Sequence, residues 1–193
     1  MCSSGLVAWA EENSRDSIFT ALQNNETYGT SGTRPKVRSF GGWGLKQHAC
    51  ATHFVKRGYE RGVPMGGTLP KRIGRRSPRF IAAAWKDDFI GTDLQRIQIV
   101  KGWLDESGQT HEAVFDVAVT DVDQGPVGRQ CHGMGEAGTG SEHLCAVWKD
   151  PQFDPAQKAF YYARVLENPV CRYTTWICQE AGVNPFSPRC KDQ

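Results

Sequence analysis

The sequence predicts a mainly β fold, an antiparallel β-sandwich preceded by a short α-helix. Short extended runs follow one another after Gly32, and glycine, proline and aspartate turns separate them. No convincing helical period returns after that point. The clearest alternation places Ala113, Phe115, Val117 and Val119 on one face of a strand. Evenly spaced strands of this kind are typical of a sandwich.

One helix is expected close to the N-terminus. Asn13 or Ser14 can cap its first turn, because both side chains accept hydrogen bonds from backbone N–H groups. Two asparagines at 24–25 mark its end. The helix carries one apolar stripe, formed by Ile18, Phe19 and Leu22.

Seven strands are expected from alternating or β-branched runs bounded by turn residues. In the third, Ile97 and Ile99 alternate with Arg96 and Gln98, which indicates one buried and one exposed face. The predicted strands cover residues 34–40, 79–86, 94–104, 111–120, 144–148, 159–167 and 172–177.

Length, charge and hydropathy limit the classes of function. The chain has 193 residues, which fits one domain or one domain with a small appendage. Its formal net charge is +2, and the basic run at 71–79 lacks interleaved aromatics, so we expect no nucleic acid partner. We expect neither a signal peptide nor a membrane partner, because the sequence holds no suitable apolar run. As written, the product is expected to be cytoplasmic.

The seven cysteines do not fit a cytoplasmic location, because disulfides form in oxidising compartments. Cys131 and Cys145 flank a glycine-rich segment, and Cys171 and Cys178 flank an aromatic run, so each pair would close a short loop. Cys50 with Cys190 is the remaining pair. Six cysteines allow many pairings, and the connectivity stays open at this point.

Several strings resemble the C-terminal part of the bacterial domain-of-unknown-function family numbered 3604. They occur in the same order and cover nearly the whole chain. The strings are WAEEN (9–13), YGTSGTR (28–34), FGGW (40–43), GVPMGG (62–67), RIQIVKGW (96–103), WKDPQFDP (148–155) and AFYYARVLEN (159–168).

The resemblance implies a missing partner domain. In that family the N-terminal part looks like a metal-dependent phosphoesterase core of the polymerase-and-histidinol-phosphatase type, whose metal ligands precede the segment matched by residues 4–13. Residues 1–32 would then be the last helix and strand of that core, and residues 33–193 a β-sandwich domain. The family also implies an exported or periplasmic parent with disulfides. No catalytic residue is transferred to this chain.

One cluster suggests a metal site. His48, Cys50 and His53 are three zinc-type ligands within six residues. Their spacing matches neither a zinc finger nor the His-Glu-x-x-His helix of metalloproteases. A loop with one disulfide cysteine and two exposed histidines explains them equally well, and we expect that arrangement. A fourth zinc ligand would come from Cys131, His132, His143 or Cys145.

The aromatic residues offer a second type of site. Trp43, Trp103 and Trp176 are the candidates for a face that stacks a sugar or another ring, although core packing explains most aromatics in predicted strands. We therefore expect a non-catalytic β-sandwich module without a cofactor. The alternatives are a carbohydrate- or small-ligand-binding module and a residual zinc-dependent hydrolase. The helix stripe Ile18, Phe19 and Leu22 would pack in the upstream domain of the parent protein; without that domain we expect it to be mobile or covered by a second copy of the chain.

Overall fold

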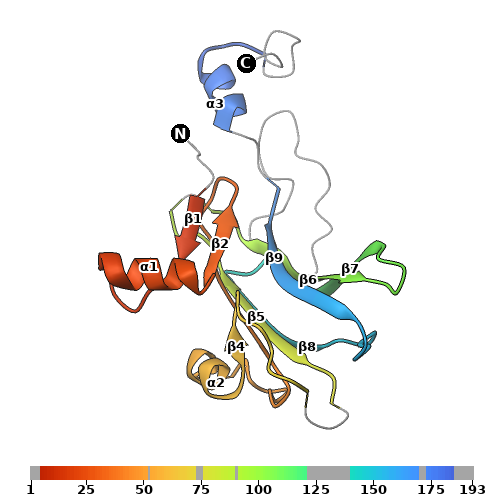
Figure 1. The fold of residues 1–193 in the computed structure, drawn as a ribbon. Coiled ribbons are helices and arrows are strands. Elements are labelled where there is room, and N and C mark those ends of the chain that lie inside the picture. The colour runs from red at the N-terminus through yellow and green to blue at the C-terminus, as the bar shows by residue number, and fades with distance from the viewer. Residues whose placement is uncertain are drawn as a thin grey trace.

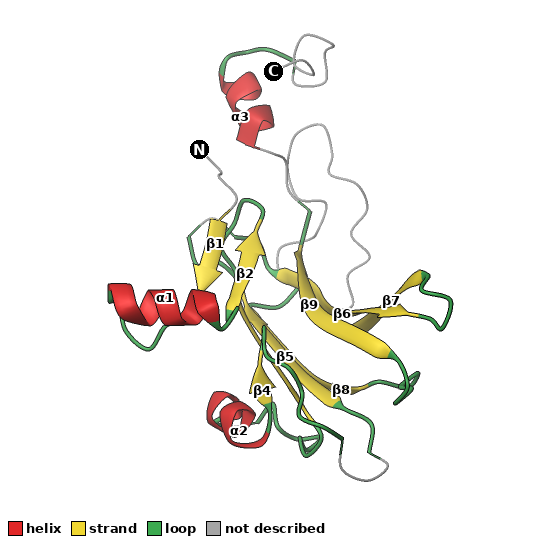
Figure 2. Cartoon of the chain, in the orientation of Figure 1, coloured by secondary structure: helices red, strands yellow, loops and turns green. Residues whose placement is uncertain are grey.

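Strands dominate the computed structural model, which describes residues 5–51, 53–72, 76–89, 91–120, 140–169 and 173–184. Figures 1 and 2 show their arrangement. In chain order the elements are β1 (Gly5–Ala8), α1 (Arg15–Gln23), β2 (Thr27–Thr30), β3 (Lys36–Gly42), α2 (Phe54–Arg61), β4 (Val63–Pro64), β5 (Arg79–Trp85), β6 (Leu94–Leu104), β7 (Thr110–Val119), β8 (His143–Lys149), β9 (Lys158–Glu167) and α3 (Tyr173–Glu180).

Two antiparallel sheets face each other and form the body of the molecule (Figure 2). One has the strand order β4-β3-β5-β8 and the other β7-β6-β9. β8 lies against β7 and β6, β5 lies against β6, and β3 lies against β9. A third, two-stranded sheet pairs β1 with β2. The predicted mainly β fold is confirmed, and the facing sheets have the arrangement of a sandwich.

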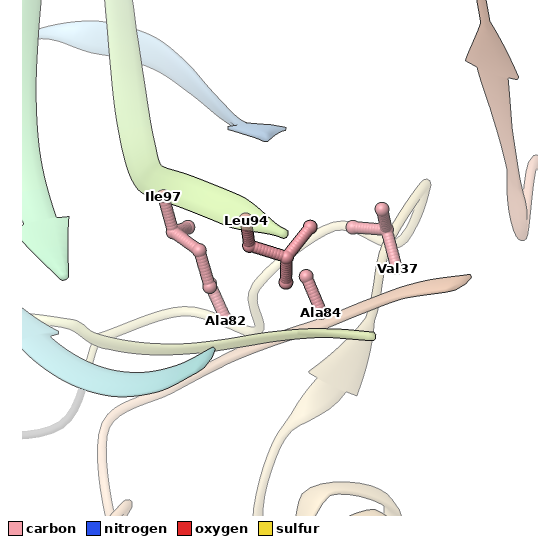
Figure 3. Close-up of a cluster of buried hydrophobic side chains, with 5 residues drawn as sticks. All are labelled: Val37, Ala82, Ala84, Leu94 and Ile97. Carbon is pink, nitrogen blue, oxygen red and sulfur yellow. The ribbon is translucent and has the colours of Figure 1, made fainter. Parts of the chain in front are cut away.

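The space between the two sheets holds the first core cluster. Figure 3 shows Leu94 and Ile97 of β6 beside Val37 of β3 and the alanines of β5. Leu94 and Ile97 are completely buried, which stabilises the fold by roughly 1.5–3 kcal/mol for each side chain. Because Ala82 and Ala84 are small, the sheets approach closely here.

A second core cluster lies on the opposite face of the four-stranded sheet. Phe40 of β3 and Ile81 of β5 pack there against Leu45 and Ala49 of the following loop. α2 covers the same face, and its Gly58 allows the Phe40 ring to approach, since a Cβ at Gly58 would lie 2.5 Å from that ring. β5 is therefore buried on both faces.

The N-terminal unit, β1-α1-β2, contacts the sandwich through β3. α1 begins where expected, because the Ser14 hydroxyl accepts a hydrogen bond from the Ser17 N–H at 3.3 Å. Trp9 donates its indole N–H to the Val37 carbonyl at 2.8 Å. The guanidinium carbon of Arg38 lies over the Trp9 ring, 3.9 Å from the ring centroid. An ion pair between Arg38 and Glu26 at 2.8 Å adds a second link.

Six of the seven predicted strands are confirmed, with end shifts of one or two residues. The prediction at 172–177 is wrong, because Tyr173–Glu180 forms helix α3. The β-branched and aromatic composition favoured a strand, yet none of the described strands pairs with this segment. Its backbone bonds internally instead, with the Ala181 N–H donating to the Ile177 carbonyl at 3.0 Å. The expectation of no helix after Gly32 is also wrong, since α2 forms as well.

The predicted inward face of β7 is correct except at its end. A β-bulge between Ile97 and Gln98 pairs Ile97 with Ala118 and Gln98 with Asp116. The extra residue reverses the alternation, so Val119 is exposed while Phe115 and Val117 stay half-buried. Among the described residues, no helix is long and apolar enough to cross a membrane.

Candidate binding groove

A groove opens where β3 and β4 face β9. It consists of two cavities, of about 590 and 550 Å³, which we call the upper and lower chambers. Both volumes fall in the range of small-molecule sites. The two chambers are adjacent, because four residues line both of them: Ser39, Met65, Gly66 and Tyr161.

Small side chains create this space. Val37 faces the other sheet, so the period of two places Ser39 and Gly41 on the same face of β3. Ala163 of β9 lines the upper chamber from the other side. β4 pairs with two residues of β3, Phe40 and Gly41, and the edge of β3 beyond them bonds to Met65 and Trp9.

The loop after β4 closes one wall of the groove. Gly66 has a positive φ of 82°, and a Cβ at this position would lie 2.2 Å from the Asn25 carbonyl oxygen. The Met65 N–H donates to the Ser39 carbonyl at 3.0 Å. A glycine at 66 thus allows the loop to pass against the N-terminal unit and still bond to β3.

Aromatic rings line the lower chamber. The Trp43 indole N–H donates to the Pro70 carbonyl at 2.9 Å, which fixes the ring. Phe153 lies edge-on to Trp43, with ring centroids 5.8 Å apart, and the Arg72 guanidinium is 5.7 Å from the Phe153 centroid. Phe80 and Tyr161 also line this chamber, and their ring centroids are 4.3 Å apart.

Tyr161 belongs to a buried polar network behind the groove. Lys101 Nζ pairs with Asp150 Oδ2 at 2.8 Å, and the two side chains are only 2% and 0% exposed. Tyr161 donates its hydroxyl to the same carboxylate oxygen at 2.6 Å. Lys101 also donates to the Gln152 carbonyl at 2.7 Å. Burial, with the hydrogen bond to Asp150 and its negative charge, raises the pKa of Tyr161, so the phenol stays neutral.

The upper chamber ends at Glu167. The Thr33 hydroxyl donates to one oxygen of this carboxylate, and the other oxygen is buried without a hydrogen-bond partner among the described residues. Burial raises the pKa of Glu167, the Thr33 hydrogen bond opposes that change, and the negative charge of Asp87 adds to it. The Tyr28 hydroxyl donates to the Pro35 carbonyl at 3.1 Å on the opposite wall.

Cys50, the middle residue of the predicted zinc site, is not available as a zinc ligand in the structure. Cys50 is bonded to Cys145, so its sulfur is not a thiolate. His48 and His53 are exposed. No group of three or more histidine, cysteine, aspartate or glutamate side chains suited to a metal ion occurs within the described ranges. The structure thus favours the alternative, a loop with one disulfide cysteine and two exposed histidines.

The Cys50–Cys145 disulfide corrects two predicted pairings, Cys131 with Cys145 and Cys50 with Cys190. The pairings assumed that neighbouring cysteines close short loops, whereas these partners are 95 residues apart. β8 aligns beside β5 and presents Cys145 to the layer that contains Cys50. Cys178 lies in α3, and the other candidates, Cys131, Cys171 and Cys190, lie outside the described residues along with His132.

The three tryptophans nominated for ligand stacking are separated in the structure. Trp43 lines the groove. Trp103 is half-buried and stacks on His111 at 5.3 Å, and it does not line either chamber. Trp176 lies in α3, and its side chain is outside the described part. Sequence reasoning missed the Lys101–Asp150–Tyr161 network, although a lysine at an inward position after Ile97 and Ile99 is a usable signal.

A family model described as "Protein of unknown function (DUF3604)" matches residues 1–192. The chain therefore belongs to this family. The comparison with curated proteins found no match, and neither did the comparison with solved structures.

Proposed function

We propose that this chain is a non-catalytic module of a larger phosphoesterase-like protein and that it binds a small ligand in the groove. The observation that carries the proposal is the pair of adjacent chambers between β3 and β9. Concave sites lined by aromatic rings, with a few polar groups, are the usual form of a ligand site. The groove has this composition, from Trp43 and Phe153 at one end to Thr33 and Glu167 at the other.

The side chains of the groove favour binding over catalysis. Its described lining contains one carboxylate, Glu167, and neither histidine nor cysteine. General acid–base catalysis needs a donor and an acceptor of suitable pKa within reach of each other. Tyr161 does not supply the second group, because its raised pKa keeps it protonated and its hydroxyl is donated to Asp150.

The proposed link to an upstream domain is supported by α1. The stripe predicted from the sequence lies on the surface, with Ile18, Phe19 and Leu22 exposed by 37%, 58% and 41%. A helix normally buries such a stripe. An upstream phosphoesterase-like domain would cover it and place the sandwich beside the metal site of that domain.

The ligand-binding proposal is tested by thermal shift with a chemically diverse library of sugars, nucleosides, amino acids and aromatic acids. A ligand that binds only the folded chain raises the melting temperature. Ala163→Phe fills the upper chamber and should abolish the shift. Val114→Phe, on the exposed face of β7, is the matched control and should retain it. A library without any shift, or a shift that Ala163→Phe leaves intact, contradicts the proposal.

The proposed parent protein is tested on the genome. The sequence immediately 5′ of the Met1 codon should encode, in the same frame, a domain rich in histidine and aspartate. A stop codon with a ribosome-binding site there would contradict the proposal. In a pull-down with that domain, Phe19→Ser should weaken binding and Val119→Ser, 53% exposed on β7, should not. A dimer in light scattering that Phe19→Ser dissociates would instead identify a second copy as the cover.

A further inference from the structure

We infer that the groove binds a neutral oligosaccharide, with one sugar ring at Trp43 and the next units extending toward Glu167. The inference rests on the proposed ligand-binding function and specifies the class of ligand. Three features of the described lining carry it: the aromatic rings of the lower chamber, the uncharged hydrogen-bonding side chains along both chambers, and the near balance of charge.

The aromatic end suits the apolar face of a sugar ring. A pyranose presents C–H groups on its faces and hydroxyls around its edge, so it stacks on a fixed aromatic ring. Trp43 is fixed by its hydrogen bond to Pro70 and by edge-on contact with Phe153. Both rings are half-buried, and each retains surface in the lower chamber.

The walls of both chambers suit the hydroxyls of the sugar. Hydroxyl and amide side chains both donate and accept hydrogen bonds, as sugar hydroxyls do. The amide oxygen of Gln157 is buried without a hydrogen-bond partner in the part of the chain that the structure describes, so this side chain gains a bond if it turns toward a hydroxyl in the groove. Uncharged polar residues of this kind in the lining include Thr27, Ser31, Ser39, Thr68 and Gln157.

The charges of the groove favour a neutral ligand. Its charged side chains are Arg72, Arg164 and Glu167. Arg164 donates to Gln98 at 2.8 Å, an interaction on the exposed side of its sheet, and Arg72 lies near Phe153. Glu167 sits in the upper chamber, where a carboxylate or sulfate of an acidic sugar would be repelled. A polyanion would therefore find one cation in the lower chamber and, in the upper one, the opposite charges of Arg164 and Glu167.

Two adjacent chambers favour an oligomer over a single ring. Each chamber alone has the volume of a small-molecule site, and they meet at Ser39 and Tyr161. A chain of linked sugars gains contacts in both chambers for one loss of translational freedom. Affinity should rise from the monosaccharide to the hexasaccharide.

The test is a tryptophan fluorescence titration of the full, disulfide-bonded chain. The neutral probes are cellohexaose, xylohexaose, maltohexaose and laminarihexaose; hexagalacturonate is the acidic probe of equal length, and glucose is the single ring. We expect saturable quenching by at least one neutral hexasaccharide and weaker binding of hexagalacturonate and glucose. Trp43→Phe should weaken binding up to about fivefold, since one stacking contact is worth roughly 1 kcal/mol. Trp103→Phe, outside the groove, should keep the affinity.

Each other outcome overturns the inference in a recognisable way. Binding of hexagalacturonate without any neutral probe means that the ligand is acidic. Neutral binding that neither Trp43→Phe nor Ala163→Phe weakens, with both variants folded by circular dichroism, means that the sugar binds elsewhere. No response to any hexasaccharide overturns the inference while the library test decides the proposed function separately. A non-sugar ligand whose thermal shift Ala163→Phe abolishes leaves the proposed function in place.

Discussion

The two sides of the space between the sheets differ in how they are filled. On the closed side, β8 lies against β7 and β6, and Trp148 meets Phe115 with ring centroids 4.8 Å apart. On the open side, β3 lies against β9, and the facing residues Ser39, Gly41 and Ala163 leave the groove. The same pair of antiparallel sheets is therefore packed at one side and hollow at the other.

This difference shows that the site arises from side-chain size at facing positions. Protein interiors are close-packed, so a hollow of this size between two sheets requires small residues on both walls. On the open side β3 pairs with β5 and β6 pairs with β9 over most of their length, so the hollow does not come from missing backbone pairing. The Lys101–Asp150–Tyr161 network connects the two sides, because its residues come from β6, the turn after β8, and β9.

Removing the cation of this network, Lys101, should lower the free energy of unfolding more than any of the other substitutions that we propose. Lys101→Met leaves the Asp150 carboxylate buried without its partner, and breaking a buried pair in this way costs about 3–5 kcal/mol. Urea unfolding measures the loss. The variant Lys101→Met/Asp150→Asn removes both charges while the amide oxygen still accepts from Tyr161, so it should recover part of that loss. A double variant as unstable as the sum of both single variants would show that the pair is not coupled.

Loss of the disulfide should affect the closed side more than the open side. Cys50→Ser/Cys145→Ser removes a cross-link between the loop before α2 and β8, and native disulfides typically contribute about 2–4 kcal/mol. In hydrogen exchange monitored by mass spectrometry, protection should fall in β8 and in residues 45–51 and change less in β9. Equal loss in β8 and β9 would contradict this separation of the two sides.

An alanine-to-leucine substitution on each side tests directly whether the space there is filled or empty. Ala82→Leu adds three carbons at a fully buried position of the closed core and should destabilise the fold by about 1–3 kcal/mol. Ala163→Leu adds them at the wall of the upper chamber, where space exists, and should change the free energy of unfolding by less than about 0.5 kcal/mol. Equal losses in urea unfolding would mean that the groove is closed in solution.

Local sequence patterns predicted most of the β-structure. Alternation located β6 at its exact bounds, Leu94–Leu104, because Ile97 and Ile99 alternate with Arg96 and Gln98 in the middle of that strand. α2 was missed, since it has only eight residues and contains Gly58, which serves packing against Phe40 and not helix stability. α3 was predicted as a strand from composition, and strand composition does not decide the structure of a segment without a pairing edge.

The groove could not be predicted, because it depends on which strands face each other. Trp43 was nominated from its residue type, but its relation to Phe153 and Tyr161 requires the packing of three separate segments. The same limit explains the disulfide error: Cys50 and Cys145 meet through the β5–β8 pairing and not through proximity in sequence. Residue types identify the chemistry, whereas long-range pairing decides which residues share a site.

The smallest effect is expected from the carboxylate on the open side, and its sign can be derived. Burial raises the pKa of Glu167 above its ordinary value of 4.5, so the folded state binds more protons than the unfolded state just above that value. The contribution of Glu167 to stability is therefore greatest below pH 4.5 and is lost as the pH rises through its folded pKa. Glu167→Gln removes the charge and keeps an acceptor for the Thr33 hydroxyl.

Urea unfolding at several pH values should show Glu167→Gln more stable than the original chain at neutral pH. The difference should disappear below pH 4.5, where the carboxyl group is protonated in both states. Glu112→Gln, which removes an exposed carboxylate from β7, is the control and should change stability by less than about 0.5 kcal/mol. A Glu167→Gln difference that stays constant with pH would mean that Glu167 is hydrated in the groove, because an open, water-filled chamber restores an ordinary carboxylate.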